Sequence, residues 1–364
     1  MKITELKLRN FRNYETLTIR PAEGMNFLAG SNAQGKTNLL ESLVYLSLTR
    51  SHRISNERKL IRENCDYAVI SASVEDQGRI KELRAVIHPQ GKTLSVQKNP
   101  VKKSSDFIGL LNVVLFAPDD LYVFNDQPRE RRRIINQEIT KISQKYLFSL
   151  NRYQNLLKDR NILLKKESPD LRFLDTLDEE MASCEKEIIS YRRDFITSVN
   201  EKMKDLYRIL SDSDLDASLK YQCCIQDAEC TFENILEMHR NSREKDLEHR
   251  VTSFGIHRED MIFALNDVNV INTASQGQKR MVMLAFKMAL LEYIESKTGK
   301  RPVLLLDDVL SELDLKRQRK LIEMIRNNYQ CLITATEIPS FIRKDDIRIF
   351  MIEKGQAGCP GGTE

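Results

Sequence analysis

No stretch of the sequence stays apolar for long enough to cross a bilayer, which argues against a membrane span. The first residues, Met1 to Leu6, lack the apolar run of a secretory signal peptide. The seven cysteines are scattered; Cys223, Cys224 and Cys230 lack the paired spacing of a zinc site, and no histidine stands at ligand spacing. We therefore expect a cytoplasmic protein with reduced thiols and no membrane partner.

A strong excess of one charge is also missing. The 57 basic and 53 acidic residues leave a net charge of +4, which permits a nucleic-acid partner without requiring one. With 41% hydrophobic and 30% charged residues, the composition is that of a globular protein. A chain of 364 residues without internal repeats is long enough for two or three compact units.

What the chain does contain is a complete G-x-x-x-x-G-K-T phosphate-binding loop, Gly30 to Thr37, called the phosphate loop below. Its two glycines let the backbone bend where a Cβ would clash, so that successive N–H groups can face phosphate oxygens. Lys36 would reach the terminal phosphates, and the Thr37 hydroxyl would ligate Mg²⁺. An apolar run at 25–29 precedes the loop and a helical pattern follows it, as the motif requires. The predicted nucleotide-binding residues here are Gly30, Ser31, Asn32, Ala33, Gln34, Gly35, Lys36, Thr37 and Asn38.

A second motif supplies the carboxylates that a phosphate loop needs for hydrolysis. The apolar run 303–306 is followed directly by Asp307 and Asp308. A buried strand would deliver Asp307 to the Mg²⁺ shell beside Thr37, and Asp308 would orient or deprotonate the attacking water. We predict Asp308 and Lys36 as catalytic residues, and Thr37 and Asp307 as metal ligands for an ATP–Mg²⁺ substrate.

The hydrophobic pattern divides the chain into two kinds of structure. Short strands and helices alternate up to about residue 125 and again from about 250, whereas 129–207 reads as long helices with a break at 168–170. The expected fold class is α/β, with mixed sheets and an inserted, compact helical lobe. We expect the ATPase head at 1–125 and 250–364 and the helical lobe at 126–249. Residues 268–271 read as a strand, and the glycine-containing tail from 355 as loose chain.

Further motifs carry a family resemblance. Ser275-Gln276-Gly277-Gln278 opens a predicted helix, and Ser311 to Asp314 follows the aspartate pair. With the phosphate loop, these segments resemble the signature motif and the D-loop of the ABC-type ATPases of the SMC group. Asp308 stands where that group usually has glutamate, and the segment from Thr334 stands where transporter ATPases have a switch histidine.

The resemblance implies a head-to-tail homodimer formed on ATP. In it, Ser275 and the N–H groups of Gln276 and Gly277, with Gln278 in the same motif, would complete the γ-phosphate site of the other subunit. A helix start is a second anion site, and one chain cannot apply two such sites to the same ATP.

Over nearly the whole length, the sequence is similar to the RecF family of bacterial recombination mediators. The likeness is carried by the segments 8–14, 32–41, 118–121 and 255–260. It implies slow ATP hydrolysis used as a switch, and binding of double-stranded, gapped and junction DNA. It also implies cooperation with RecO and RecR in loading the RecA recombinase.

Other classes were weighed against this interpretation. A transporter's nucleotide-binding subunit is disfavoured by the strand-rich 67–98 region, the helical lobe and the more than 200 residues between Lys36 and Ser275. An overcoming-lysogenization-type nuclease would need a further carboxylate-rich metal domain, and none is visible after Glu353. Another SMC-like ATPase stays an alternative.

Three basic groups remain open at this point. The basic loop 50–53, together with Arg58, Lys59 and Arg62 after it, is either solvated or close to nucleotide or DNA phosphates. Arg131, Arg132 and Arg133, at a predicted helix start, form a solvated face or meet an anionic partner. His257 and Arg258 either make structural hydrogen bonds or contact DNA or nucleotide.

Overall fold

The computed structural model describes residues 1–125, 127–226, 230–343 and 347–358, and the last tail residues, 359–364, lie outside this part. The chain forms two compact units. The first unit contains 1–121, 205–214 and 283–364, and the second contains 122–204 and 215–282. This division differs from the expected one in two places. Residues 205–214, expected in the helical lobe, belong to the unit with the phosphate loop, and residues 250–282, which include the signature motif and were expected in the head, belong to the helical unit.

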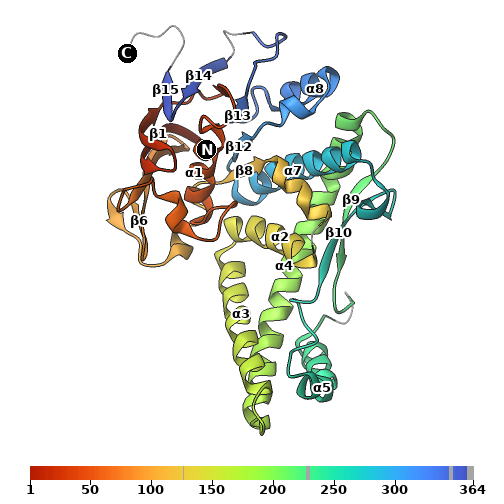
Figure 1. Ribbon diagram of the computed structural model, residues 1–364. Helices are drawn as coiled ribbons and strands as arrows, with labels where there is room; N and C mark the ends of the chain where they lie inside the picture. Colours follow the sequence, from red (N-terminus) through yellow and green to blue (C-terminus); the bar gives the residue numbers. More distant parts are fainter. Residues whose placement is uncertain (126, 227–229, 344–346, 359–364) are drawn as a thin grey trace. The chain divides into compact units, whose positions relative to one another are not determined.

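A largely parallel sheet carries the site in the first unit (Figure 1), and within the described residues its order is β15-β14-β3-β13-β12-β8. All its neighbours pair in parallel except β15, which is antiparallel to β14. Every residue of β3 and β12 is buried, as expected for strands covered on both faces. The strands are β3 (Met25–Ala29), β8 (Val113–Phe116), β12 (Val303–Leu306), β13 (Cys331–Ala335), β14 (Ile347–Glu353) and β15 (Gln356–Gly358).

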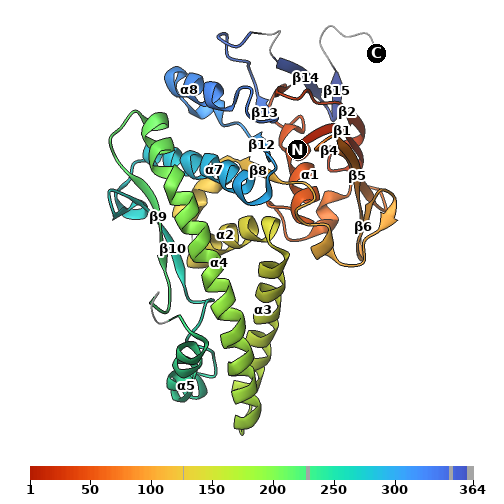
Figure 2. The same ribbon diagram turned by 180° about the vertical axis from the view of Figure 1, so that it is seen from behind.

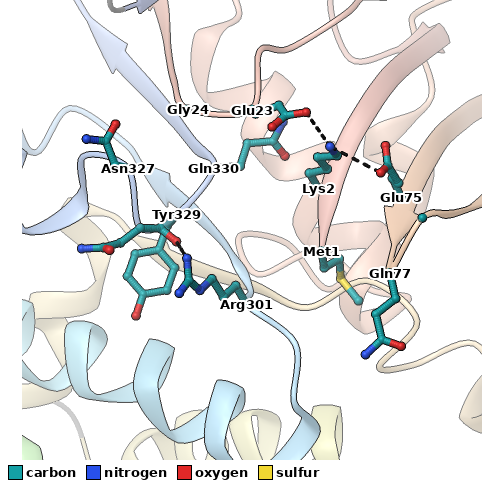
Figure 3. A pocket seen from close by; sticks show the side chains of 12 residues that line it. Met1, Lys2, Glu23, Gly24, Glu75, Gln77, Arg301, Asn327, Tyr329 and Gln330 are labelled. Atoms are coloured by element: carbon teal, nitrogen blue, oxygen red, sulfur yellow. Dashed lines mark hydrogen bonds and ion pairs between the residues drawn. The ribbon is translucent and has the colours of Figure 1, made fainter.

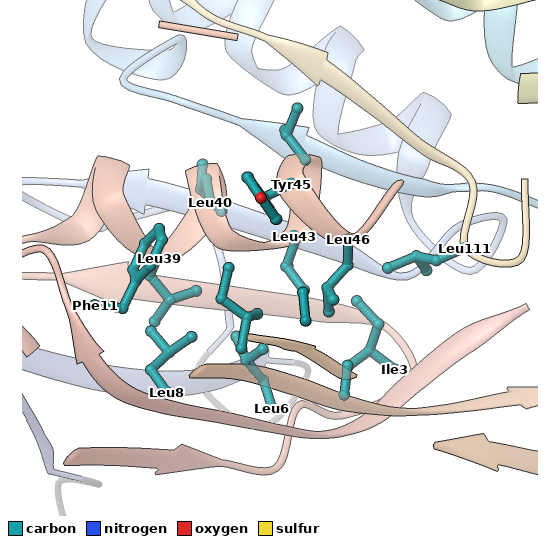
Figure 4. Close-up of a cluster of buried hydrophobic side chains, with 14 of the residues drawn as sticks. Ile3, Leu6, Leu8, Phe11, Leu39, Leu40, Leu43, Tyr45, Leu46 and Leu111 are labelled. Atoms are coloured by element: carbon teal, nitrogen blue, oxygen red, sulfur yellow. The ribbon is translucent and has the colours of Figure 1, made fainter. Parts of the chain in front are cut away.

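An antiparallel sheet, in the order β2-β1-β4-β5-β6-β7, forms the rest of the N-terminal part. Its apolar side chains meet helix α1 (Lys36–Leu48), and Figure 4 shows Leu6 and Leu8 of β1 beneath Leu39 and Leu43 of α1. All four are at most 3% exposed, and burying each stabilises the unit by about 2 kcal/mol. This packing anchors the helix that follows the phosphate loop. The strands are β1 (Lys2–Phe11), β2 (Tyr14–Ile19), β4 (Ala68–Asp76), β5 (Arg79–His88), β6 (Gly91–Val96) and β7 (Asn99–Pro100).

Long helices dominate the second unit. In both Figures 1 and 2, α3 and α4 run side by side as a hairpin, in agreement with the predicted break at 168–170. A small sheet of order β11-β10-β9 accompanies them among the described residues. The elements are α2 (Pro128–Ile142), α3 (Gln144–Leu164), α4 (Leu171–Ser211), β9 (Ala217–Gln222), α5 (Phe232–His249), β10 (Asp260–Leu265), β11 (Val268–Asn269) and α6 (Val270–Thr273). Helix α7 (Gln276–Thr298) begins in the second unit and continues in the first, to which α8 (Leu315–Ile325) also belongs.

Two local predictions were wrong. The strand expected at 268–271 stops at Asn269, because the Asn269 side chain accepts a hydrogen bond from the Ile271 N–H (2.9 Å) and starts the short helix α6. Part of the tail expected to be loose is the strand β15, paired with β14. None of the described helices combines the length and the apolar character that a bilayer span needs.

Candidate nucleotide-binding site

The phosphate loop joins the buried strand β3 to helix α1, and its two glycines have positive φ angles, 153° at Gly30 and 114° at Gly35. A Cβ on Gly30 would lie 2.3 Å from the Ile352 carbonyl oxygen, and one on Gly35 would lie 2.5 Å from the Asn13 side-chain nitrogen. Glycine is therefore required at both positions by conformation and by close approach.

A bracket of side chains holds the loop from outside. Asn13 donates to the Gln34 carbonyl oxygen (2.9 Å), and Asn38 donates to the Asn13 side-chain oxygen (2.9 Å). The Gln34 side chain accepts from the Lys354 N–H (2.7 Å), at the turn between β14 and β15. Gln34 and Asn38 thus brace the phosphate loop, and their contact with nucleotide stays a prediction.

Lys36 is folded onto its own loop. Its ammonium donates to the carbonyl oxygens of Gly30 and, at 3.3 Å, Ser31, and the residue is 8% exposed. Burial lowers the pKa of Lys36, and the carboxylates of Asp308 and Asp307 oppose that shift. Ser31 and the two residues after it, Asn32 and Ala33, are exposed and therefore accessible to a ligand.

Thr37 and Asp307 meet as expected for a shared Mg²⁺ site. The Thr37 hydroxyl donates to Asp307 Oδ1 across 3.0 Å, although the two residues are 270 positions apart. Adjacent oxygen ligands of an octahedral Mg²⁺ also lie about 3 Å apart, given Mg–O distances of about 2.1 Å. The distance between these two oxygens therefore matches that of neighbouring ligands of one Mg²⁺ ion.

A residue of uncertain role in the sequence, Thr334, supports the aspartate pair. Its hydroxyl donates to Asp307 Oδ1 (2.8 Å) and accepts from the Asp308 N–H (2.8 Å). Thr334 is 1% exposed, and Asp308 has a left-handed φ of 53°. Burial raises the pKa of Asp307, and the hydrogen bonds from Thr334 and Thr37 counteract the rise. Thr334 therefore holds the Asp307 carboxylate and the Asp308 backbone, which the sequence did not reveal.

The basic loop 50–53 approaches the site through Arg53. The Arg53 guanidinium donates to the Asn38 side-chain oxygen (3.3 Å), and its charge favours the ionised form of Asp307, whose pKa it lowers. The fully buried Glu41 of α1 anchors this loop, because it accepts hydrogen bonds from Ser51 and, at 2.8 and 2.9 Å, from Arg12. Of the two interpretations, proximity to the nucleotide site is favoured.

The signature motif starts helix α7 with a reciprocal capping box. Ser275 Oγ accepts from the Gln278 N–H (3.2 Å), and the Gln278 side chain accepts from the Ser275 N–H (2.9 Å). Ser275, Gln276 and Gly277 are exposed. The helix start is therefore capped by its own side chains and accessible.

The arginines at the start of α2 correct an expectation. Arg131 is 5% exposed and donates twice to the Asp260 carboxylate (2.7 and 2.8 Å), so it neither lies on a solvated face nor reaches an outside anion. Arg132 donates to the Glu259 carbonyl oxygen. Arg133 is the exposed member, paired with Glu130.

His257 and Arg258 both make hydrogen bonds within this fold. His257 Nδ1 lies 2.7 Å from the Tyr153 hydroxyl, and both His257 Nε2 and an Arg258 nitrogen contact the Thr252 carbonyl oxygen, at 3.1 and 2.9 Å. Burial lowers the pKa of His257 to about 4, so its ring is neutral at pH 7. These contacts favour the structural interpretation for His257, whereas Arg258 is exposed and its contact with DNA or nucleotide stays open.

An open pocket of about 570 Å³ lies away from this chemistry (Figure 3). Gly24, Arg301 and Gln330 line it, and they precede the amino ends of β3, β12 and β13, whereas the phosphate loop follows the carboxyl end of β3. Its Lys2 is already paired with Glu23 and Glu75. We do not assign the nucleotide to this pocket.

The strands, the phosphate loop and the aspartate pair define a phosphate-loop ATPase head of the SMC type. The family model described as "RecF/RecN/SMC N terminal domain" matches residues 2–357. The Smc head bound to the C-winged helix domain of ScpA has the same fold, with a TM-score of 0.58 at 16% identity over 99% of this chain and 97% of that one.

Within that class, the chain belongs to the RecF family. It is 35% identical over 367 residues to the DNA replication and repair protein RecF of Lacticaseibacillus casei (strain BL23), covering 98% of this chain and 99% of the relative. The corresponding protein of Clostridium tetani (strain Massachusetts / E88) is 37% identical over 365 residues, with the same coverage. A solved structure of the recombination mediator protein RecF with ATPrS, in the RecFOR pathway, superimposes with a TM-score of 0.89 at 30% identity over 98% of both chains. The predicted fold class and family are confirmed.

Proposed function

We propose that this protein is an ATP-switched DNA-binding protein of recombinational repair. The observation that carries the proposal is the convergence of Thr37, Asp307, Thr334 and Asp308 beside an intact phosphate loop, in a chain of the RecF family. Solved RecF structures with ATP and ATPrS support ATP as the nucleotide.

The chain's own residues suffice to place an ATP–Mg²⁺ substrate. Lys36 would exchange its two carbonyl contacts for the terminal phosphates, and Thr37 and Asp307 would hold the Mg²⁺ that neutralises phosphate charge. Asp308, held through its N–H by Thr334, would orient the attacking water. Hydrolysis would be slow, as suits a switch.

The proposed switch is dimerisation on ATP. The exposed start of α7, with Ser275 and the following N–H groups already ordered by Gln278, is built to accept an anion. A second copy of the chain would bring this motif to the γ-phosphate held by the first copy.

We propose double-stranded, gapped and junction DNA as the ligand of the ATP-bound dimer, acting with RecO and RecR in the cytoplasm to load RecA. The RecFOR pathway of the solved relatives supports these partners. Binding through phosphates would be steeply salt-dependent, since each neutralised phosphate of duplex DNA contributes about −0.9 to the log–log slope.

Sedimentation with and without ATP, Mg²⁺ and duplex or gapped DNA tests the proposal. Wild type should dimerise only with ATP and bind duplex DNA more tightly as the dimer. Lys36→Ala should lose ATP binding and dimerisation, whereas Ser275→Arg should bind ATP and stay monomeric. Asp308→Asn should bind ATP and remain dimeric without turnover. Glu63→Ala, which replaces an exposed acidic residue outside the phosphate loop, is the control and should behave as wild type.

Two results would contradict the proposal. Equal affinity of monomer and dimer for duplex DNA would remove the switch. Unchanged ATP affinity in Lys36→Ala, or normal turnover in Asp308→Asn, would remove the roles assigned to those residues.

A further inference from the structure

Two thiols and a carboxylate converge in the second unit, outside the phosphate loop, the aspartate pair and the signature motif. Cys223 Sγ and Cys224 Sγ lie 3.2 and 3.0 Å from the same oxygen, Oε1 of Glu259. The three ligand-type atoms lie within 4.8 Å of one another, and in the described part of the chain no other group of at least three histidine, cysteine or acidic side chains converges in this way.

The sheet register explains why they meet. Strands β9 and β10 are antiparallel, and Gln222 pairs with Asp260 at the end of the ladder. The next residues along each strand are Cys223 and Glu259, so these two face each other where the ladder ends. The cysteine spacing alone could not reveal this group, because the third side chain lies 35 or 36 positions away.

The Glu259 carboxylate is held in place by its other oxygen. Oε2 accepts from the Arg192 guanidinium (2.5 Å) and from the Tyr221 hydroxyl, and Glu259 is 3% exposed. Oε1 accepts from the Cys224 N–H (3.2 Å) and from the two thiols. Outer contacts that orient a ligand in this way are typical of metal centres.

We propose that Cys223, Cys224 and Glu259 form a binding site for a thiophilic divalent cation, with Zn²⁺ as the ion of choice. Thiolate sulfur and carboxylate oxygen are both zinc ligands, at about 2.3 and 2.1 Å, and thiolates disfavour Mg²⁺ and Ca²⁺. Both cysteines are only half-buried, so solvent water can fill the fourth tetrahedral position.

The charge balance supports this exchange. Binding would release the two thiol protons and form two Zn–S bonds and one Zn–O bond, so that two protons leave for one divalent ion. The net charge of the cluster is therefore unchanged. Arg193 donates to Cys223 Sγ (3.6 Å) and to the Ile225 carbonyl oxygen (2.8 Å), and it favours the thiolate that the ion requires.

A bound ion would clamp the open end of the β9–β10 ladder. It would tie the residues after β9 to the residue before β10, next to the Arg131–Asp260 ion pair. The site shares no residue with the phosphate loop or the aspartate pair, so it stands or falls independently of the proposed ATPase function.

The test uses the full-length, reduced protein after removal of metals. Titration with Zn²⁺ against a chromophoric chelator should give one tight equivalent per chain, and Co²⁺ should produce a thiolate-to-cobalt charge-transfer band. Cys223→Ser and Cys224→Ser should each weaken Zn²⁺ binding at least tenfold and lose the band. Cys65→Ser, which removes another half-buried thiol, is the matched control and should leave both unchanged.

A second measurement does not depend on whether the variants fold. Zn²⁺ should slow alkylation of Cys223 and Cys224 in the wild-type protein, as followed by peptide mass spectrometry, and leave Cys65 unprotected. The absence of the cobalt band in folded wild type, or equal alkylation with and without Zn²⁺, would overturn the assignment. The Co²⁺ band separates this site from the sulfur-free Thr37–Asp307 pair.

Discussion

Replacing Thr334 by valine would remove one hydroxyl from the centre of the site while keeping the shape of the side chain. Thr334 is 1% exposed, so no water is available to take the place of the hydroxyl. The change deletes the hydrogen bond from the hydroxyl to Asp307 Oδ1 (2.8 Å). It also removes the acceptor of the Asp308 N–H, which lies 2.8 Å from the same hydroxyl.

The expected cost follows from these two contacts. A hydrogen bond to a carboxylate contributes about 1.5–3 kcal/mol, and an unsatisfied buried N–H costs about 1–3 kcal/mol. Because the two effects share one hydroxyl and do not add fully, we expect the free energy of unfolding to fall by roughly 2–4 kcal/mol. Loss of a hydrogen bond that orients a metal-binding carboxylate, here that of Asp307, reduces activity by roughly 10- to 100-fold.

The pH profile should shift as well. Burial already raises the pKa of Asp307, and Thr334 supplies a hydrogen bond that lowers it. Without that bond the pKa rises further, so the carboxylate is protonated at higher pH. The acidic limb of the ATPase profile should move to higher pH, and the Mg²⁺ requirement should increase.

The assay compares Thr334→Val with Thr334→Ser and Thr336→Val in ATPase titrations over Mg²⁺ and pH and in urea unfolding. Serine keeps the hydroxyl and should restore most activity. Thr336 is an exposed threonine two positions further on, and its valine variant should resemble wild type. If Thr334→Val and Thr336→Val had the same kcat and the same pH profile, the positioning role of Thr334 would be refuted.

Three other outcomes follow from the structure. Gly30→Ala should abolish ATP binding and lower the free energy of unfolding by several kcal/mol, because the added Cβ would lie 2.3 Å from the Ile352 carbonyl oxygen. The fluorescence of a bound nucleotide analogue and urea unfolding measure the two effects. Near-normal ATP binding would contradict this close approach. Arg131→Met should destabilise the second unit by about 3–5 kcal/mol, because it leaves the mostly buried Asp260 carboxylate without its partner. Arg133→Met, at an exposed arginine, should cost at most about 1 kcal/mol. Equal melting temperatures of the two variants would be inconsistent with the buried Arg131–Asp260 pair. Burial lowers the pKa of His52 from 6.5 to about 4. Below about pH 6.5 the unfolded chain therefore takes up a proton that the folded ring does not, and the free energy of unfolding falls towards pH 4. In His52→Gln, urea unfolding should show a smaller fall, by at most about 1.4 kcal/mol per pH unit, and an unchanged dependence of stability on pH would argue against a neutral ring in the folded state.

Local patterns predicted the parts of the site that are contiguous in the chain. The apolar run before Gly30, the helix from Lys36 and the apolar run before Asp307 are short segments whose structure depends on nearby residues. The region 67–98, expected to be rich in strands, contains β4, β5 and β6.

Predictions failed or stayed undecided where a residue or strand depends on an interaction partner far away in the sequence. Arg131 at a helix start could not be assigned from its neighbours, because its partner Asp260 lies 129 positions away. The short strand β15 was missed because three residues with glycine carry little strand signal, and pairing with β14 stabilises them.

The sequence by itself predicted the ATPase class, because Gly30, Lys36, Thr37, Asp307 and Asp308 belong to two short motifs that can be recognised from contiguous residues. Only the tertiary structure decided what holds those residues in place: Thr334 under the aspartates and Asn13 under the phosphate loop. It also brought Glu259 to the cysteine pair. The physical reason is that hydrogen bonds and ligand distances act through space over about 3 Å, whereas a sequence motif records only order along the chain.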